Sequence, residues 1–181
     1  MTTKVEQVAA LARAALEAGE NVGEVLRSFR EEAGLGAIES ILALRAIEPI
    51  GLDAAKQLVA GACDGRSFAH LGLADLASLA TIASLPGGPS GILRWGLRDA
   101  VIDHRPWCLF VPGEPGSVTF YTATSPEPAL GGTVHGEGVS LAAIREEASA
   151  LASDPRWSEE IEIVRDEPEA LLVRFRRVPG L

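Results

Sequence analysis

The sequence has few of the residues that build cross-linked, basic or membrane-spanning proteins. Two cysteines among 181 residues are too few for a disulfide framework. A net charge of −9 argues against a nucleic-acid binder, because such a protein needs a cationic face to displace phosphate counterions. No apolar run approaches the roughly 20 residues of a membrane span, and the N-terminus lacks the pattern of a signal peptide. We therefore expect a cytoplasmic protein that binds neither nucleic acid nor a membrane.

Aromatic residues are also scarce, at 5% of the chain, and they are unevenly distributed. Only Phe29 and Phe68 precede residue 86, and all the other aromatic residues follow it. Charge is spread more evenly, because residues 1–85 hold 7 Lys and Arg against 11 Asp and Glu, and residues 86–181 hold 9 against 14. The acidity therefore marks no single surface, whereas the aromatic content predicts two differently built cores.

The first half of the chain has the spacing of helices. Thr3 and Asn21 are residue types that cap helix N-termini, and Gly19 and Gly34 are residue types that end helices. Apolar residues three or four apart follow each cap, and the third helix carries Ile38, Ile41, Leu42 and Arg45 at this spacing. The expected helices cover about residues 4–18, 22–32, 38–47, 52–60 and 73–85, with a loop over 61–72.

Residues 86–91 form the clearest boundary, since two prolines and three glycines in six residues cannot continue a helix. This segment lacks the Gly-Lys-Ser/Thr ending of a phosphate-binding loop, so we interpret it as a linker. Beyond it we expect a helix over 92–102, strands over 107–111 and 117–124, a long connection over 126–138 with a short strand near 133–135, a helix over 141–152, and strands over 160–163 and 173–176. The predicted fold is α+β, with a helical region over 1–85 and, over 92–181, an α-β-β-α-β-β domain with an antiparallel sheet.

Alternation of apolar and charged residues predicts the register of the last hairpin. Pairing Asp166 with Ala170 around a turn at 167–169 gives one apolar face and one face with opposite charges across the strands. Each such cross-strand pair contributes roughly 0.2–1 kcal/mol. The predicted pairs are Ile161 with Phe175, Ile163 with Val173, Glu162 with Arg174, and Glu160 with Arg176.

Residues 38–60 resemble a known helical hairpin, that of the C-terminal domain of the bacterial ribosomal stalk protein. The second helix of that family reads Gly-Leu-x-x-Ala-Lys-x-Leu-Val, which matches the run from Gly51 to Val59, and Arg45 matches the end of its first helix. The resemblance covers 23 of 181 residues. In the family this hairpin docks translation factors, so the resemblance implies a protein-binding face around Arg45 and Lys56. DNA reading by the same hairpin is disfavoured, because its surroundings are acidic and only Lys56 and Gln57 offer contacts.

Residues able to bind a metal are few. Cys63 and His70 lie in the expected 61–72 loop, and His104 and Cys108 lie where a helix gives way to a strand. Together they have the composition of a zinc site. Structural zinc sites usually take ligands roughly two to five residues apart on tight turns, and Cys63 and His70 are spaced too widely for this. We therefore predict no metal and no cofactor.

A nucleophilic site would pair Cys108 with His135 and with an acid such as Asp103 or Glu137. Cys108, however, falls in an apolar strand, where a buried thiol is inert. The sequence also lacks the Gly-x-Ser-x-Gly and His-Glu-x-x-His motifs. A small enzyme that uses the C-terminal sheet and the 125–138 loop with His104, Cys108 or His135 is the alternative hypothesis.

The favoured hypothesis is a non-catalytic, cytoplasmic protein-interaction or adaptor protein, of an immunity, chaperone-like or regulatory kind. The sequence shows no catalytic motif, which favours this hypothesis. Its distributed acidity also suits electrostatic steering of a basic partner protein. Arg45 and Lys56 are the predicted partner-binding residues.

Overall fold

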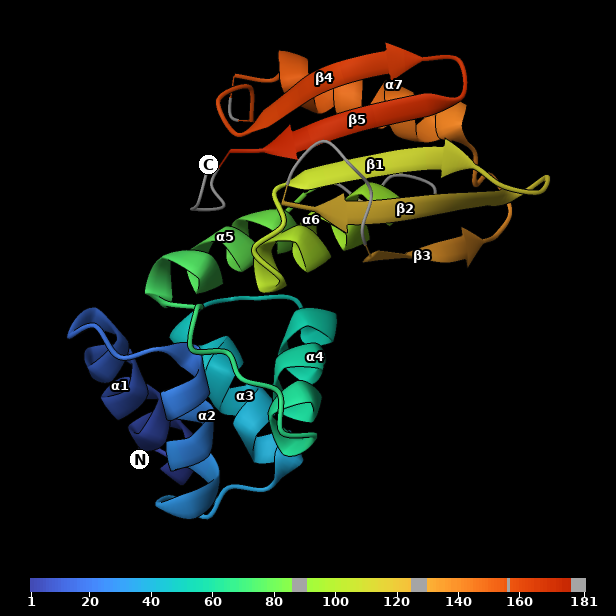
Figure 1. Ribbon diagram of the computed structural model, residues 1–181. Helices are drawn as coiled ribbons and strands as arrows, with labels where there is room; N and C mark the ends of the chain where they lie inside the picture. The colour runs from blue at the N-terminus through green and yellow to red at the C-terminus, as the bar shows by residue number, and fades with distance from the viewer. Residues whose placement is uncertain (86–90, 125–129, 156, 177–181) are drawn as a thin grey trace. The chain divides into compact units, whose positions relative to one another are not determined.

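The computed structural model describes residues 1–85, 91–124, 130–155 and 157–176. The chain divides into two compact units, Met1–Ser84 and Leu85–Leu181 (Figure 1). Residues 86–90 of the predicted linker lie outside the described residues, and Gly91 is the N-cap of helix α6 (Ile92–Ile102) with a left-handed φ of 60°. Among the described helices, none is both long enough and apolar enough to cross a membrane.

The first unit consists of helices, two of which begin at the caps that the sequence predicts. Thr3 accepts a hydrogen bond from the backbone N–H of Glu6 at 3.2 Å, and Asn21 accepts one from Glu24 at 3.0 Å. Each glutamate accepts the N–H of its cap residue in return. The helices are α1 (Lys4–Glu17), α2 (Val22–Glu31), α3 (Ala37–Ile47), α4 (Leu52–Cys63) and α5 (Leu73–Ala83). Cys63 is thus the last residue of α4 and not part of a loop.

The core of the first unit is centred on α3, which packs against α1 and α4. The residues that α3 buries include the small Ser40 and Ala43, which let neighbouring helices approach closely. Arg13 links α1 to the C-terminal end of α3. Its guanidinium donates a hydrogen bond to the carbonyl of Ile47 and pairs with Glu48 at 3.1 Å. α3 is thus packed through the side that carries its buried residues, and its opposite side is not covered by these helices.

The second unit is a five-stranded antiparallel sheet with α6 and α7 (Leu141–Ser153), which confirms the α+β fold. Its order is β3-β2-β1-β5-β4. The strands are β1 (Trp107–Pro112), β2 (Ser117–Ala123), β3 (Leu130–His135), β4 (Ile161–Glu167) and β5 (Ala170–Phe175).

The domain is therefore α-β-β-β-α-β-β, and the predicted order lacked one strand. The short strand expected near 133–135 begins at Leu130 and pairs with β2 along its length. Glycine content made this segment look like a loop, but glycine is what the pairing needs. A Cβ on Gly131 would lie 1.8 Å from the carbonyl oxygen of Phe120, so only glycine fits beside β2 here.

Both helices of the second unit cover the same face of the sheet (Figure 1). α6 packs on β1 and β2, α7 packs on β4 and β5, and the two helices contact each other. Gly96 allows the close approach of α6, because a Cβ at this position would lie 2.6 Å from Sγ of Cys108 and 3.1 Å from Cζ of Phe110. α6 therefore packs directly against the buried side chains of Cys108 and Phe110.

The terminal hairpin keeps the predicted register only in its outer part. The prediction that Asp166 pairs with Ala170 is wrong, because the register shifts between Ile163 and Arg165 and Glu167 pairs with Ala170. Val164 is the extra residue of this bulge, and it is exposed. The confirmed pairs are Ile161 with Phe175, Glu162 with Arg174, and Ile163 with Val173, and the backbone of Arg176 donates to the carbonyl of Glu160 at 2.9 Å.

Candidate functional site

The α3–α4 hairpin forms as the sequence predicts, and it exposes both predicted partner-binding residues. α3 packs against α4, and Arg45 and Lys56 are exposed. Helices α2 and α5, rather than strands, precede and follow the hairpin in the chain. We call the outward side of α3 with Lys56 of α4 the hairpin face.

The hairpin face is apolar at its centre. Ile38 and Leu42 are 75% and 48% exposed, and they lie one helical turn apart on the same side of α3. Arg45 follows them on that side at the next turn. The opposite side of α3 holds its buried residues, so no neighbouring helix of the first unit covers the aliphatic pair.

The acidic residues of the hairpin are engaged at helix N-termini. Glu39 accepts a hydrogen bond from the backbone N–H of Gly36 at 2.9 Å, and Asp53 lies in the first turn of α4, where the helix dipole favours a carboxylate. Within the described part of the chain, neither Arg45 nor Lys56 forms an ion pair. The outward side of α3 therefore combines two exposed aliphatic side chains with the unpaired Arg45, and α4 adds the unpaired Lys56.

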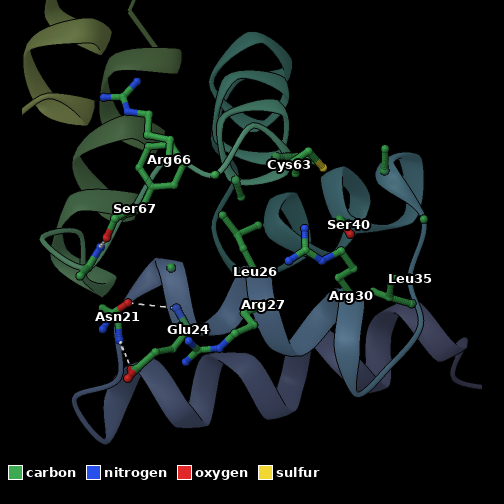
Figure 2. Close-up of a pocket in the computed structure, with 18 residues that line it drawn as sticks. Asn21, Glu24, Leu26, Arg27, Arg30, Leu35, Ser40, Cys63, Arg66 and Ser67 are labelled. Atoms are coloured by element: carbon green, nitrogen blue, oxygen red, sulfur yellow. Dashed lines mark hydrogen bonds between the residues drawn. The ribbon is translucent and has the colours of Figure 1, made fainter.

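A cavity of about 570 Å³ lies between α2, the start of α3, the end of α4 and the loop that follows α4 (Figure 2). We call it the α2–α4 cavity. Its volume falls in the range of roughly 300–1,000 Å³ that small-molecule sites occupy. Buried apolar residues form part of its wall: Leu26, Leu35, Val59 and Phe68.

Three arginines line this cavity: Arg27, Arg30 and Arg66. Arg27 and Arg30 leave α2 one turn apart, and Figure 2 shows Arg30 extending from α2 toward the side of the cavity that holds Cys63 and Ser40. The guanidinium of Arg66 is turned away from the other two, and it lies 4.9 Å above the ring of Phe68. Figure 2 shows the side chain of Arg27 running along α2 toward Glu24, so Arg30 is the arginine of α2 that is directed into the interior.

Negative charge on the lining is limited to Glu24 among its described residues. The carboxylate of Glu24 accepts the backbone N–H of Asn21 at 3.2 Å, so it is engaged in the cap of α2. Three cations against one engaged carboxylate make the lining positive within a half of the chain that is acidic as a whole. The charge of the cavity lining is therefore opposite in sign to the net charge of this half of the chain.

Ser40 adds a hydroxyl to the cavity wall. Its side chain is 6% exposed, and within the described part of the chain it makes no side-chain hydrogen bond. Ala37, the first residue of α3, lies on the same wall. The positive end of α3 already has an anion, because the carboxylate of Glu39 in its first turn accepts the N–H of Gly36. This side of the cavity therefore offers the Ser40 hydroxyl as a hydrogen-bond donor on the side toward which Arg30 extends.

Cys108 does not have the properties of a nucleophile. It is fully buried on β1 against Gly96 of α6. Burial raises the pKa of the Cys108 thiol far above its ordinary value, and the negative charge of Asp99 raises this pKa further. The reactive thiolate is therefore not formed at neutral pH.

The structure does not bring Cys108 and His135 together. Cys108 pairs with Thr122 on β2, whereas His135 of β3 pairs with Ser117, five residues farther along the same strand. At about 3.3 Å per residue, this separates the two by about 17 Å along the strands. His104 lies in the turn after α6 with a left-handed φ of 51°, in the segment that leads into β1.

The other sequence candidates are distributed over both units. Cys63 and His70 belong to the first unit, and His104 and Cys108 belong to the second. The described residues contain no group of three or more His, Cys, Asp or Glu side chains that could hold a metal ion. The expected 125–138 loop is in part strand β3, and residues 125–129 lie outside the described residues.

Comparisons with protein-family models, with curated proteins and with solved structures find no match to this chain. The site must therefore be judged on its own geometry.

Sequence analysis did not single out Arg27, Arg30 or Ser40. The two arginines have the outward spacing of an ordinary solvated helix face. One signal was available, because like charges three residues apart on a helix repel each other by roughly 0.2–0.5 kcal/mol. Ser40 gives no comparable signal, since its burial beside a cavity depends on tertiary packing.

Proposed function

We propose that this chain is a non-catalytic protein-interaction protein that binds a partner through the hairpin face. One observation carries the proposal: Ile38 and Leu42, 75% and 48% exposed, lie one turn apart beside Arg45, which has no ion pair in the described part of the chain. Isolated exposed aliphatic residues are ordinary on protein surfaces, whereas these two adjoin each other, and arginine is enriched at protein interfaces.

Covering the aliphatic pair provides a driving force for association. Full burial of one large aliphatic side chain contributes about 1.5–3 kcal/mol. Because Leu42 is already about half covered, the two residues together supply roughly 2–4 kcal/mol. That is a modest share of a stable complex, so Arg45 and Lys56 must add specificity through the partner's charges.

The chemistry of the hairpin face favours one kind of occupant, an amphipathic helix of another protein. Its apolar side would cover Ile38 and Leu42, and a carboxylate would reach Arg45 or Lys56. The net charge of −9 steers approach at longer range and favours a partner that is basic as a whole. These two requirements are compatible, since a basic protein can carry an acidic residue in its docking helix.

The alternative of a small enzyme has less support. It depends on Cys108, which burial makes unreactive, on His135, which lies about 17 Å along the sheet from it, or on His104 in the turn after α6. We therefore retain only the interaction function.

Site-directed capture tests the proposal. A photo-crosslinking residue at position 38 should capture a protein at low salt, and the double variant Ile38→Asp with Leu42→Asp should lose its affinity for that purified partner. Leu11→Asp is the matched control, because Leu11 is 74% exposed but lies on α1 beside the groove between α1 and α2. Arg45→Glu should also weaken binding, and added salt should slow association.

Three outcomes would contradict the proposal. The double variant could bind the captured protein as tightly as the natural chain does, or Leu11→Asp could weaken binding equally. Alternatively, the partner at position 38 could be a second copy of this chain, in which case the double variant would shift the oligomeric state in light scattering and the face would be a self-association surface.

A further inference from the structure

The α2–α4 cavity is separate from the hairpin face. Its lining includes none of Ile38, Leu42 and Arg45. A function of the cavity is therefore independent of the proposed partner binding, although α3 contributes to both.

The arginines of α2 lack strong partners. Among the described residues Arg27 forms no ion pair. Arg30 pairs only with the adjacent Glu31, at 3.5 Å, and both side chains are more than half exposed, so solvent screens this pair. Two like charges one turn apart also repel each other. An anion bound beside Arg30 would offset this repulsion and satisfy its guanidinium group.

The opposite wall is suited to the same ligand. Ser40 lines the cavity, its hydroxyl makes no hydrogen bond in the described part of the chain, and the residue is 6% exposed. Donors thus converge from two helices on a space that also has an apolar wall.

We propose that the α2–α4 cavity binds a small organic anion. Its charged group, a phosphate or a carboxylate, is held by Arg30 and accepts a hydrogen bond from Ser40. Its apolar body rests against Leu26 and Val59. A cavity of about 570 Å³ is far larger than a bare inorganic anion needs, which is why the ligand has an organic body.

Cys63 provides a direct reporter of occupancy. It lines the cavity and is exposed, whereas Cys108 is buried, so a thiol reagent modifies Cys63 selectively in the native protein. The probes are phenyl phosphate, benzoate and benzyl alcohol, which share a ring and differ in charged group. Saturable protection of Cys63, confirmed by calorimetry, is expected at millimolar or lower concentrations of phenyl phosphate or benzoate. The tighter of these two identifies the phosphate or the carboxylate class.

Matched variants separate a built site from general electrostatics. Arg30→Gln should weaken binding of the charged probe by about tenfold or more, because it removes a charge-assisted hydrogen bond. Arg45→Gln makes the same change in net charge on the hairpin face and should leave the affinity unchanged. Ser40→Ala should weaken binding several-fold. Arg30 and Arg45 are both exposed, so neither variant removes buried packing.

The proposal is overturned if neither charged probe protects Cys63 in a saturable manner. It is also overturned if benzyl alcohol binds as tightly as the charged probes, or if Arg45→Gln weakens binding as much as Arg30→Gln. Loss of partner capture in the Ile38 and Leu42 variants has no bearing on these results, because those residues do not line the cavity.

Discussion

Replacement of Gly96 by alanine tests how α6 packs on the sheet. In a helix interior alanine is favoured over glycine by about 1 kcal/mol, so the change would stabilise an isolated helix. Here the new Cβ would lie 2.6 Å from Sγ of Cys108 and 3.1 Å from Cζ of Phe110, and both side chains are fully buried. Overpacking of a core costs about 1–3 kcal/mol, and this contact belongs at the upper end. We expect Gly96→Ala to lower the free energy of unfolding of the second unit by about 2 kcal/mol.

Tryptophan fluorescence is the assay for this variant. All three tryptophans, Trp95, Trp107 and Trp157, lie in the second unit, so their emission follows its unfolding alone. For a unit of this size, a loss of about 2 kcal/mol lowers the midpoint of thermal unfolding by roughly 10 °C. Urea titration of the same signal gives the free energy directly.

A double-mutant cycle identifies the atom responsible. Cys108→Ala removes Sγ, so in that background Gly96→Ala should cost less than about 1 kcal/mol, with only the 3.1 Å contact to Phe110 remaining. An equal cost in both backgrounds, or a Gly96→Ala protein as stable as the natural one, would refute the packing described for α6.

Three further predictions concern stability. Because burial raises the pKa of Cys108 above its ordinary value of 9.0, the thiol ionises only in the unfolded state as the pH rises past 9.0. The free energy of unfolding should therefore fall above that pH by up to about 1.4 kcal/mol per pH unit. Urea titrations of Cys108→Ala should lack this contribution to the pH dependence. Arg13→Ala should destabilise the first unit by about 1 kcal/mol in circular dichroism, because it removes the hydrogen bond to Ile47, whereas Arg45→Ala should have no measurable effect. Ser140→Ala should cost the second unit about 1 kcal/mol by tryptophan fluorescence, since the Ser140 side chain caps α7.

Helix positions could be predicted because local signals agree with the tertiary structure. Thr3 and Asn21 make the capping contacts that their chemistry favours, and α1 and α2 begin at the next residue. The strand at Leu130–His135 could be predicted only in part. In a sequence, two adjacent glycines usually indicate a turn. Here Gly131 lies in a strand, because the backbone of Phe120 approaches too closely for a residue with a Cβ.

The bulge at Val164 was missed for a different reason. The predicted register assumes that apolar and charged residues alternate through the whole hairpin. Ile163 and Val164 are adjacent apolar residues, however, and they already break this alternation. Placing Val164 in a bulge lets the pairs on either side remain in register with their own partners. The outer pairs were predicted correctly because three residues on each strand alternate without interruption.

The exposed side of α3 could not be derived from spacing. Apolar residues occur around most of this helix, so periodicity alone permits either side to face the core. Tertiary packing decides, and it buries the side with Ser40 and Ala43, where small side chains allow α1 and α4 to approach. The larger Ile38 and Leu42 are left outside, which is what makes them candidates for a partner.

Net charge was the least informative property, because it does not distinguish paired from unpaired groups. In the second unit, arginines are neutralised by nearby carboxylates, as Arg145 is by Asp166 and Arg174 is by Glu162. In the described part of the first unit, Arg27, Arg45 and Lys56 form no ion pair. Salt screens exposed charges beyond about 8–10 Å, so a ligand in the α2–α4 cavity or a helix on the hairpin face responds to these cations more than to distant carboxylates. An evenly acidic chain can therefore carry local sites for acidic groups, and the pattern of ion pairing, rather than the count of charges, indicates where they lie.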